Sequence, residues 1–362
     1  MAMFRRLVTA NAIAAVVVVL LTLLVPSFVD NLSLIGIFTT ANVFAMFAAS
    51  WDILSGFTGQ VNFGHAAFIG TGGFTVGLLT KYDHFTPDVR MLLGTLAAAA
   101  LGVVIGVPAL RLRGPYLALA TLASATALLR LNFIYKAQTG GEEGISGIPG
   151  LEESAVLGPI GRGLSRLVLG RSTFDEMRPF DQFYLVNYYA VLVVALLMIG
   201  GLMLLGYGRR GLVLRSIQQD EVAAEAAGVP VVRYKLAAFV LSGACGGLAG
   251  AIWVHTLSNV GINTLLVDLS LLIIVMAALG GAGTIVGPVA GAYAVIWLQD
   301  YVLDKLLTGS VPAEKLSEVK VMTFTALLVV VLIVQPRGLV APLLLRRRAP
   351  QPLATPVETA DG

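Results

Sequence analysis

Cysteine and histidine are scarce in this chain of 362 residues, which contains one cysteine, Cys245, and three histidines. A disulfide framework needs at least two cysteines, and a Cys/His metal site needs several ligands at suitable spacing. No Ser/His/Asp set or carboxylate pair stands out, and a Gly-Lys-Ser/Thr phosphate loop is missing. The sequence therefore predicts no disulfide, no metal site, no catalytic residue and no ATP site of its own.

Charged residues are also few, at 12% of the chain, whereas 57% of the residues are hydrophobic. The net charge of +3 comes from basic residues at the ends of apolar runs, and a nucleic-acid binder needs a basic stripe instead. This composition lies far outside that of soluble domains. It predicts an all-α polytopic membrane protein that contacts the lipid bilayer and no nucleic acid.

Long apolar runs set the predicted number of spans. Crossing the hydrocarbon core of about 30 Å takes roughly 20 apolar residues in a helix. The first run follows Arg5 and Arg6 as in a signal peptide, but it is too long for one and lacks a small-x-small cleavage site, so we expect an uncleaved anchor. We predict about ten transmembrane helices, near 7–26, 32–54, 62–80, 91–110, 116–135, 184–207, 236–257, 266–284, 286–303 and 321–341.

The distribution of Lys and Arg predicts the orientation, because short cytoplasmic loops collect them. With both termini in the cytoplasm, the opposite side receives the loop 136–183, which has seven acidic and five basic residues. We expect a transmembrane domain over 1–348, with this outer loop and a cytoplasmic loop at 208–235, and a disordered tail over 349–362. The cytoplasmic side then holds Arg111, Arg113, Arg209, Arg210, Arg215, Arg233, Lys235, Arg337, Arg346, Arg347 and Arg348.

A polar segment, LRSIQQDEVAAEAAGVPVVRYK (214–235), lies between two long apolar runs. Acidic residues favour a helix N-terminus, and Gly228 followed by Pro230 indicates a helix end, so we predict a short helix over about 215–227. Its alanines leave room for a close partner surface. The alternative is a solvated helix that only follows the positive-inside distribution. The candidate docking residues are Arg215, Asp220, Glu221, Ala224, Glu225 and Gly228.

Two glycine-rich segments, 56–74 and 279–293, interrupt the apolar sequence. They predict a broken or closely packed helix beside a solute path, with small-residue helix packing as the alternative. Of the ionisable residues near the spans, we regard His65 and Asp268 as functional candidates and the others, including Asp52, as residues that reach the membrane rim. The candidate path residues are Gly59, Gln60, Asn62, Gly64, His65, Gly280, Gly281 and Gly283.

Six sequence blocks resemble the permease subunits of branched-chain amino acid ABC importers, in the same order along nearly the whole chain. Three features, LRLRG, TGG-x-x-GI and the long central loop, are more similar to the M-type permease than to its H-type partner. The blocks are GFTGQVNFGHAAFIGTGGF (56–74), LRLRGPYLALATL (110–122), TGGEEGISGIPG (139–150), DEVAAEAAGVPVVRYKLAAFVLSGACGGLAGAI (220–252), LGGAGTIVGPVAGAY (279–293) and QPRGLV (335–340).

This resemblance implies a permease subunit in a bacterial inner membrane, paired with a second, H-type permease. It also implies two cytoplasmic subunits that bind ATP and Mg and that dock on the segment near Glu221, and an extracytoplasmic solute-binding protein. Two alternatives stay open: an ion-coupled secondary transporter, and an ABC permease for urea, amides or other small solutes. Ion-driven carriers keep carboxylates or histidines deep in the bundle, and this sequence is poor in them.

Overall fold

The computed structural model of the chain describes residues 22–28, 31–82, 85–112 and 115–307, and five single residues between 315 and 326. Most of these residues are helical. The predicted spans 7–26 and 321–341 lie largely outside the described residues, and the predicted tail 349–362 lies wholly outside them. The total of about ten spans, the location of both termini and the domain boundaries at 1–348 therefore stay predictions.

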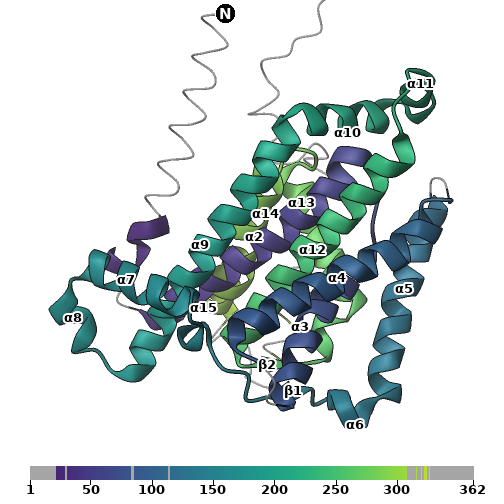
Figure 1. Cartoon of the computed structure of the whole chain (residues 1–362). Helices are drawn as coiled ribbons and strands as arrows, with labels where there is room; N and C mark the ends of the chain where they lie inside the picture. The colour runs from purple at the N-terminus through teal and green to yellow at the C-terminus, as the bar shows by residue number, and fades with distance from the viewer. Residues whose placement is uncertain are drawn as a thin grey trace, which may run out of the picture.

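Five helices in the described part of the chain are long and apolar enough to cross a membrane. Because an α-helix rises 1.5 Å per residue, even a 20-residue helix reaches about 30 Å. Figure 1 shows α2 and α12 in the middle of the molecule, with α4 and α9 against them. The prediction of an all-α polytopic membrane protein is confirmed. The five are α2 (Leu32–Thr58), α4 (Pro87–Ala109), α5 (Pro115–Ile134), α9 (Pro179–Tyr207) and α12 (Val231–Leu257).

Other apolar helices are shorter than the sequence predicts. The prediction 62–80 is wrong at its start, because α3 (His65–Lys81) begins only after a non-helical segment. The prediction 266–284 is wrong in its extent: α13 (Val267–Gly280) has 14 residues and so rises only about 21 Å. It follows the 3₁₀ turn η2 (Ile262–Thr264) and ends at a glycine turn. Beyond that turn, α14 (Val286–Trp297) continues through the π-helical η3 (Leu298–Val302) into α15 (Leu303–Leu307).

The two large polar loops lie at different ends of the molecule. Figure 1 shows α10 (Arg209–Gln219) and α11 (Glu221–Ala226) at one end, and α6 (Lys136–Thr139) with two short strands at the other. Strand β1 (Ile145–Ser146) pairs antiparallel with β2 (Asn259–Val260), which follows α12. The rest of the predicted outer loop forms η1 (Leu151–Glu153), α7 (Leu157–Leu169), which packs on α9, and α8 (Arg171–Asp175).

Helices α3, α4 and α12 pack through glycines. A Cβ atom on Gly72 of α3 would lie 2.0 Å from the carbonyl oxygen of Gly247 in α12, and one on Gly94 of α4 would lie 2.7 Å from the carbonyl oxygen of Gly72. Small residues allow such close approach between helix backbones in a membrane. The glycines within α3 thus serve helix packing, which is the alternative that the sequence left open for this segment.

Candidate functional site

Four segments, from three separate parts of the sequence, meet near the end of the molecule that carries α10. They are the C-terminal end of α2, the C-terminal end of α9, helix α10 itself, and the turn between α13 and α14, residues 281–285. We call this meeting point the α2–α10 junction. It brings Arg215, a predicted docking residue, next to the predicted path residue Gly283, and Gln218 of the same helix next to Gly59, another predicted path residue.

Asp52 is the central side chain of the junction. It lies on α2 and is fully buried. Its Oδ1 accepts a hydrogen bond from the backbone N–H of Gly283 at 2.6 Å, and its Oδ2 accepts one from that of Ile285 at 2.8 Å. Ile285 is the N-cap residue of α14, so the carboxylate also faces the positive end of that helix dipole. The interpretation of Asp52 as a residue that reaches the membrane rim is therefore wrong.

The turn bound by Asp52 has an unusual backbone. Gly283 has a φ of +80°, and Ile285, a β-branched residue, has a φ of +57°. A non-glycine residue held in such a conformation costs on the order of 1–3 kcal/mol, which the surroundings must offset. Gly56 allows α2 to come this close, since a Cβ atom there would lie 2.0 Å from Asp52 Oδ1 and 2.5 Å from the nitrogen of Gly283.

Helix α10 contacts both α2 and the turn. The guanidinium of Arg215 lies 4.7 Å from the ring centre of Phe57 and 5.3 Å from that of Tyr207, and its Nη2 donates to the carbonyl of Gly283 at 3.4 Å. The side chain of Gln218 donates to the carbonyl of Gly56 at 2.8 Å. Cation–π contacts of this kind add roughly 0.5–2 kcal/mol each. A displacement of α10 therefore acts directly on α2 and on the turn.

The polar segment forms two helices where the sequence predicted one over 215–227. The break is at Asp220, whose backbone is extended, with φ −155° and ψ 106°. Its carboxylate oxygen accepts hydrogen bonds from the N–H groups of Val222 and Ala223, both at 3.0 Å. Such N-capping stabilises the start of a new helix by about 1 kcal/mol. The predicted end is confirmed: α11 stops at Ala226, and Gly228 has a φ of +84°.

Besides Arg215, two more of the predicted docking residues face their own chain. Ala224 is buried in a small apolar cluster with Ile217 and Val231. Glu221 forms an ion pair with the buried Lys235 of α12, with 2.5 Å between Oε2 and Nζ. The exposed face of α11 instead consists of Val222, Ala223, Glu225 and Ala226, and Val222 is 68% exposed. Any partner of α11 therefore meets this face.

The predicted path residues 59–64 form an extended segment that turns back along α2. Gly59 ends α2 with a φ of +73°, and a Cβ atom there would lie 3.2 Å from Cγ of Gln218. At membrane depth, non-helical backbone is tolerated only where protein or water satisfies it. Side chains do so here: the N–H groups of Asn62, Phe63 and Gly64 donate to Ser55 Oγ, Thr121 Oγ1 and Asn62 Oδ1, and the Trp51 indole donates to the carbonyl of Asn62.

His65, the first residue of α3, is fully buried against α2. Its Nε2 lies 2.8 Å from Ser50 Oγ, and that hydroxyl donates its single hydrogen to the carbonyl of Phe47. This arrangement favours the tautomer in which Nε2 carries the proton, because a hydroxyl has one donor. Nδ1 has no partner among the described residues, and neither do the acceptor Gln60 Oε1 and the donor Asn62 Nδ2. Asp268, the other predicted ionisable candidate, is exposed at the start of α13.

The remaining path candidates pack α13 against α14. A Cβ atom on Gly280 would lie 1.7 Å from the carbonyl oxygen of Gly287, and Gly281 ends α13 with a φ of +104°. The sequence thus located two structurally demanding segments, and both lie beside α2. It gave no signal for the contacts of Asp52, Tyr207 and Gln218, because these depend on which elements meet.

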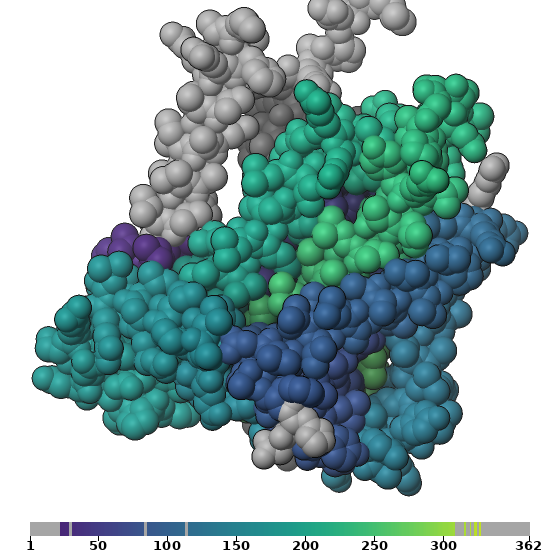
Figure 2. Space-filling view, in the orientation of Figure 1, coloured from purple at the N-terminus to yellow at the C-terminus, as the bar shows by residue number. Residues whose placement is uncertain are grey.

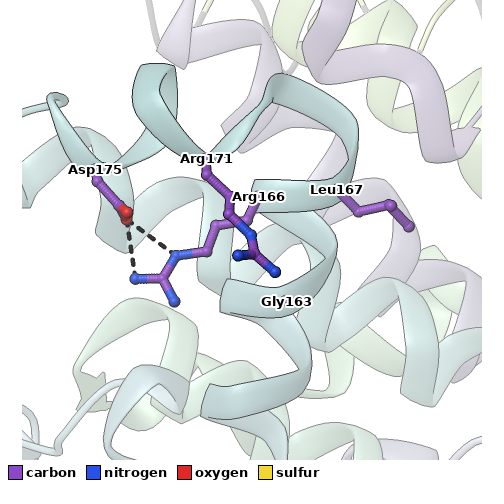
Figure 3. A pocket seen from close by; sticks show the side chains of 5 residues that line it. All are labelled: Gly163, Arg166, Leu167, Arg171 and Asp175. Atoms are coloured by element: carbon purple, nitrogen blue, oxygen red, sulfur yellow. Dashed lines mark hydrogen bonds and ion pairs between the residues drawn. The ribbon is translucent and has the colours of Figure 1, made fainter.

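Surface hollows lie away from the junction. One lies beside α7 and α8 and is lined by Gly163, Arg166, Leu167, Arg171 and Asp175. Figure 3 shows Arg166 paired with Asp175 across it, with an Nε–Oδ1 distance of 2.9 Å, while Leu167 points away from the pair. This ion pair joins α7 to α8. Its two side chains are about half exposed, and such pairs contribute little to stability.

Comparisons with known proteins give the family. The model for the branched-chain amino acid transport system / permease component matches residues 33–332. The "High-affinity branched-chain amino acid transport system permease protein LivM" of Salmonella typhimurium is 27% identical over 317 residues, which is 84% of this chain and 69% of that protein. The Escherichia coli protein of the same name is 27% identical over 310 residues, with the same coverage. No solved structure matches the chain significantly. The chain therefore belongs to the family of branched-chain amino acid transport permease components, and it is a transmembrane permease subunit of an ATP-binding cassette importer.

Proposed function

We propose that this permease forms the path for a branched-chain amino acid, or a related small polar solute, across the inner membrane of a bacterium. Two ATPase subunits, which bind ATP and Mg, drive its alternating access by docking on the exposed face of α11. The observation that carries this proposal is the geometry of α10 and α11: a short helix whose exposed face has three apolar residues and one glutamate, attached to the transmembrane helices through the α2–α10 junction.

The attachment of α11 supports a role in transmitting force. The ion pair between Glu221 and Lys235 joins α11 to α12, and the cluster of Ile217, Ala224 and Val231 joins α10, α11 and α12. Switching motions require packed elements that move as units. A docked subunit that displaces α11 would therefore displace α10 and the start of α12 with it.

The arrangement of partners follows from the polarity of the two ends. Arg209 and Arg210 begin α10, which supports a cytoplasmic location for α10 and α11 under the positive-inside rule. The acidic loop that holds Glu142 and Glu143 then faces outward, where a solute-binding protein docks. A second, H-type permease completes the path. The ten-span arrangement, with both termini in the cytoplasm, belongs to the same proposal.

The location of the solute path is proposed from unpaired polar atoms beside α2. Gln60, Asn62 and His65 each keep one buried polar atom without a partner among the described residues, although buried polar groups are normally hydrogen-bonded. A polar solute that passes this segment would supply partners for these atoms. Gly59 of the same segment ends α2, Gly64 packs against Thr121 of α5, and Gly283 of the α13–α14 turn packs against Gly56 of α2.

The rival function, an ion-coupled transporter, has less support. Such carriers need carboxylates that exchange an ion or a proton. Asp52 is deeply buried, yet both of its oxygens accept hydrogen bonds from backbone N–H groups, which indicates a structural role.

The identity of the solute is tested by competition: unlabelled leucine, isoleucine or valine should reduce uptake of labelled leucine, whereas urea and acetamide should not.

Docking at α11 is tested with Ala226→Trp, because Ala226 is exposed. The bulky ring should keep the ATPase from the face of α11, so that co-purification of the ATPase with the permease and ATP-dependent uptake in liposomes both fall at least tenfold. Ala155→Trp is the matched control. Ala155 is an exposed alanine just before α7, and its replacement should leave co-purification of the ATPase unchanged. Wild-type levels of both quantities in Ala226→Trp would place the docking surface elsewhere.

A further inference from the structure

We propose that Asp52 clamps the α13–α14 turn to the end of α2, so that α10, the end of α2 and this turn move as one rigid block during transport. This inference rests on the proposed function and adds to it the route by which motion at α11 enters the transmembrane helices. In this route Asp52 is a positioning residue. It contacts the turn, and the turn fixes the start of α14.

The first step of the argument is the clamp itself. Each carboxylate oxygen of Asp52 accepts one backbone N–H, from residues two apart in the turn. Hydrogen bonds to an ionised acceptor are roughly twice as strong as neutral ones. Two such bonds, together with the space left by Gly56, hold the positive φ of Ile285 in place. Without the carboxylate, the turn loses the partners that hold it in this conformation.

The second step is that the turn is also held from the cytoplasmic side. The hydroxyl of Tyr207, at the end of α9, donates to the carbonyl of Thr284 at 2.6 Å, and Arg215 of α10 donates to the carbonyl of Gly283. Arg215 lies over the ring of Phe57, a fully buried residue of α2. The same side chain of α10 therefore contacts both parts that Asp52 joins, so neither part can be displaced without the other.

The third step concerns α10 and α2. Gln218 donates to the carbonyl of Gly56, and its side chain packs against Gly59. A Cβ atom built on Gly59 lies 3.9 Å from Cβ of Gln218. This separation is within the range of about 3.5–4.5 Å that disulfides span. The distance therefore suits a disulfide across the contact, for which Gly59→Cys must adopt the positive φ of +73° that glycine has at this position.

The disulfide tests whether the block is rigid. In a Cys245→Ala background, Gly59→Cys with Gln218→Cys should oxidise fully in the assembled importer in liposomes. ATP-dependent uptake in the oxidised sample should stay within about twofold of the same sample after reduction. Loss of uptake on oxidation, restored by reductant, would show that α10 slides along α2 and would overturn the proposal. Failure of the disulfide to form would overturn it as well, because it would place α10 away from α2.

The clamp is tested with Asp52→Asn, which replaces one acceptor oxygen by an N–H₂ group that cannot accept. We expect the assembled complex to keep ATP hydrolysis but to lose at least tenfold in uptake per ATP hydrolysed. Asp175→Asn, at a half-exposed acid of α8 that lies away from the junction, is the control and should behave as wild type. The cysteine pair at positions 59 and 218 should still cross-link in Asp52→Asn, which shows that the protein is folded. If Asp52→Asn takes up as much solute per ATP hydrolysed as the wild type, the proposal that Asp52 clamps the turn is wrong.

Failure of the proposed function looks different from failure of this inference. If no ATPase acts on this permease, the wild-type assembly shows no ATP-dependent uptake at all. If only the clamp is wrong, the wild type transports normally and Asp52→Asn transports equally well.

Discussion

Single side chains satisfy the backbone where α2 ends and the chain turns back beside it. Thr121 of α5 is one of them: its hydroxyl accepts a hydrogen bond from the N–H of Phe63 at 3.1 Å and donates to the carbonyl of Ala118. Thr121 is buried. A buried N–H group without a partner costs about 1–3 kcal/mol, whereas the net gain from making one such bond is smaller. The geometry of the segment over 59–64 therefore depends on a few hydroxyl and amide groups.

Replacing Thr121 by valine tests this dependence. Thr121→Val keeps the shape of the side chain but leaves the N–H of Phe63 without an acceptor, so the free energy of unfolding should fall by about 1–3 kcal/mol. Thr121→Ser retains the hydroxyl and should lower the free energy of unfolding clearly less than Thr121→Val does. The midpoint of thermal unfolding of the permease in detergent measures both. Thr126→Val on the exposed side of the same helix is the control. Equal midpoints for Thr121→Val and Thr126→Val would contradict this account.

At the same scale, the sequence identified polar residues but not their partners. Asn62 and His65 stand out because amide and imidazole groups are rare within apolar sequence, and both are indeed buried. The sequence alone indicates that Asp52 reaches the membrane rim, because it lies near the end of an apolar run. The reason for its burial is a turn more than 200 residues later, and no local pattern predicts which N–H groups a carboxylate will meet. For the same reason, the pairing of Glu221 with Lys235 could not be read from the segment alone.

At the scale of elements, the packing of α3 against α12 depends on positions without a side chain. A Cβ atom at Gly72 would overlap the carbonyl of Gly247, and one at Gly250 would lie 2.2 Å from the carbonyl of Ile69. The helix backbones are in contact, so neither helix can yield without breaking its own hydrogen bonds. Association of helices within a bilayer relies on this kind of packing because lipid is as apolar as the helices.

Gly72→Ala is therefore expected to destabilise the permease by about 1–3 kcal/mol, the usual cost of overpacking. Gly200→Ala is the matched control: it lies in α9, where nothing comes within 4 Å of an added Cβ atom, and alanine is the better helix former. The midpoint of thermal unfolding in detergent should fall for Gly72→Ala and stay constant or rise for Gly200→Ala. A midpoint for Gly72→Ala as high as that of the control would show that α3 and α12 are not packed in this way.

Hydrophobic length predicted most of the long helices and failed where helices are short. Runs of apolar residues located α2, α4, α5, α9 and α12 because each is long enough to span by itself. The length of the apolar run also extended the predicted span of α13 to residue 284. The glycines of the turn that ends α13 are not polar, so they do not lower the average hydrophobicity of the run. Gly281 and Gly283 end the helix through positive φ angles, a property of backbone conformation that a hydrophobicity scale does not record.

At the scale of the whole molecule, one end is formed by the protruding helices α10 and α11, and one outer edge is formed by α5. Figure 2 shows α10 and α11 protruding at one end, and α5 forming an outer edge of the body. Four large apolar side chains of α5 are exposed: Tyr116, Leu119, Leu131 and Ile134. In a membrane such a face contacts either lipid or another apolar subunit. The second permease of the proposed assembly would cover a face of this kind.

The orientation of the whole molecule is tested by labelling from each side of the membrane. Glu225 on α11 and Glu142 in the loop before β1 are both exposed, and they lie at opposite ends. Arg209 and Arg210 predict a cytoplasmic location for the α10 end under the positive-inside rule. A membrane-impermeant maleimide should therefore label Glu142→Cys, but not Glu225→Cys, in intact cells of the Cys245→Ala background. Inverted vesicles should give the opposite pattern. If Glu225→Cys were labelled from outside, α11 would face away from the cytoplasm, and no ATPase could reach it.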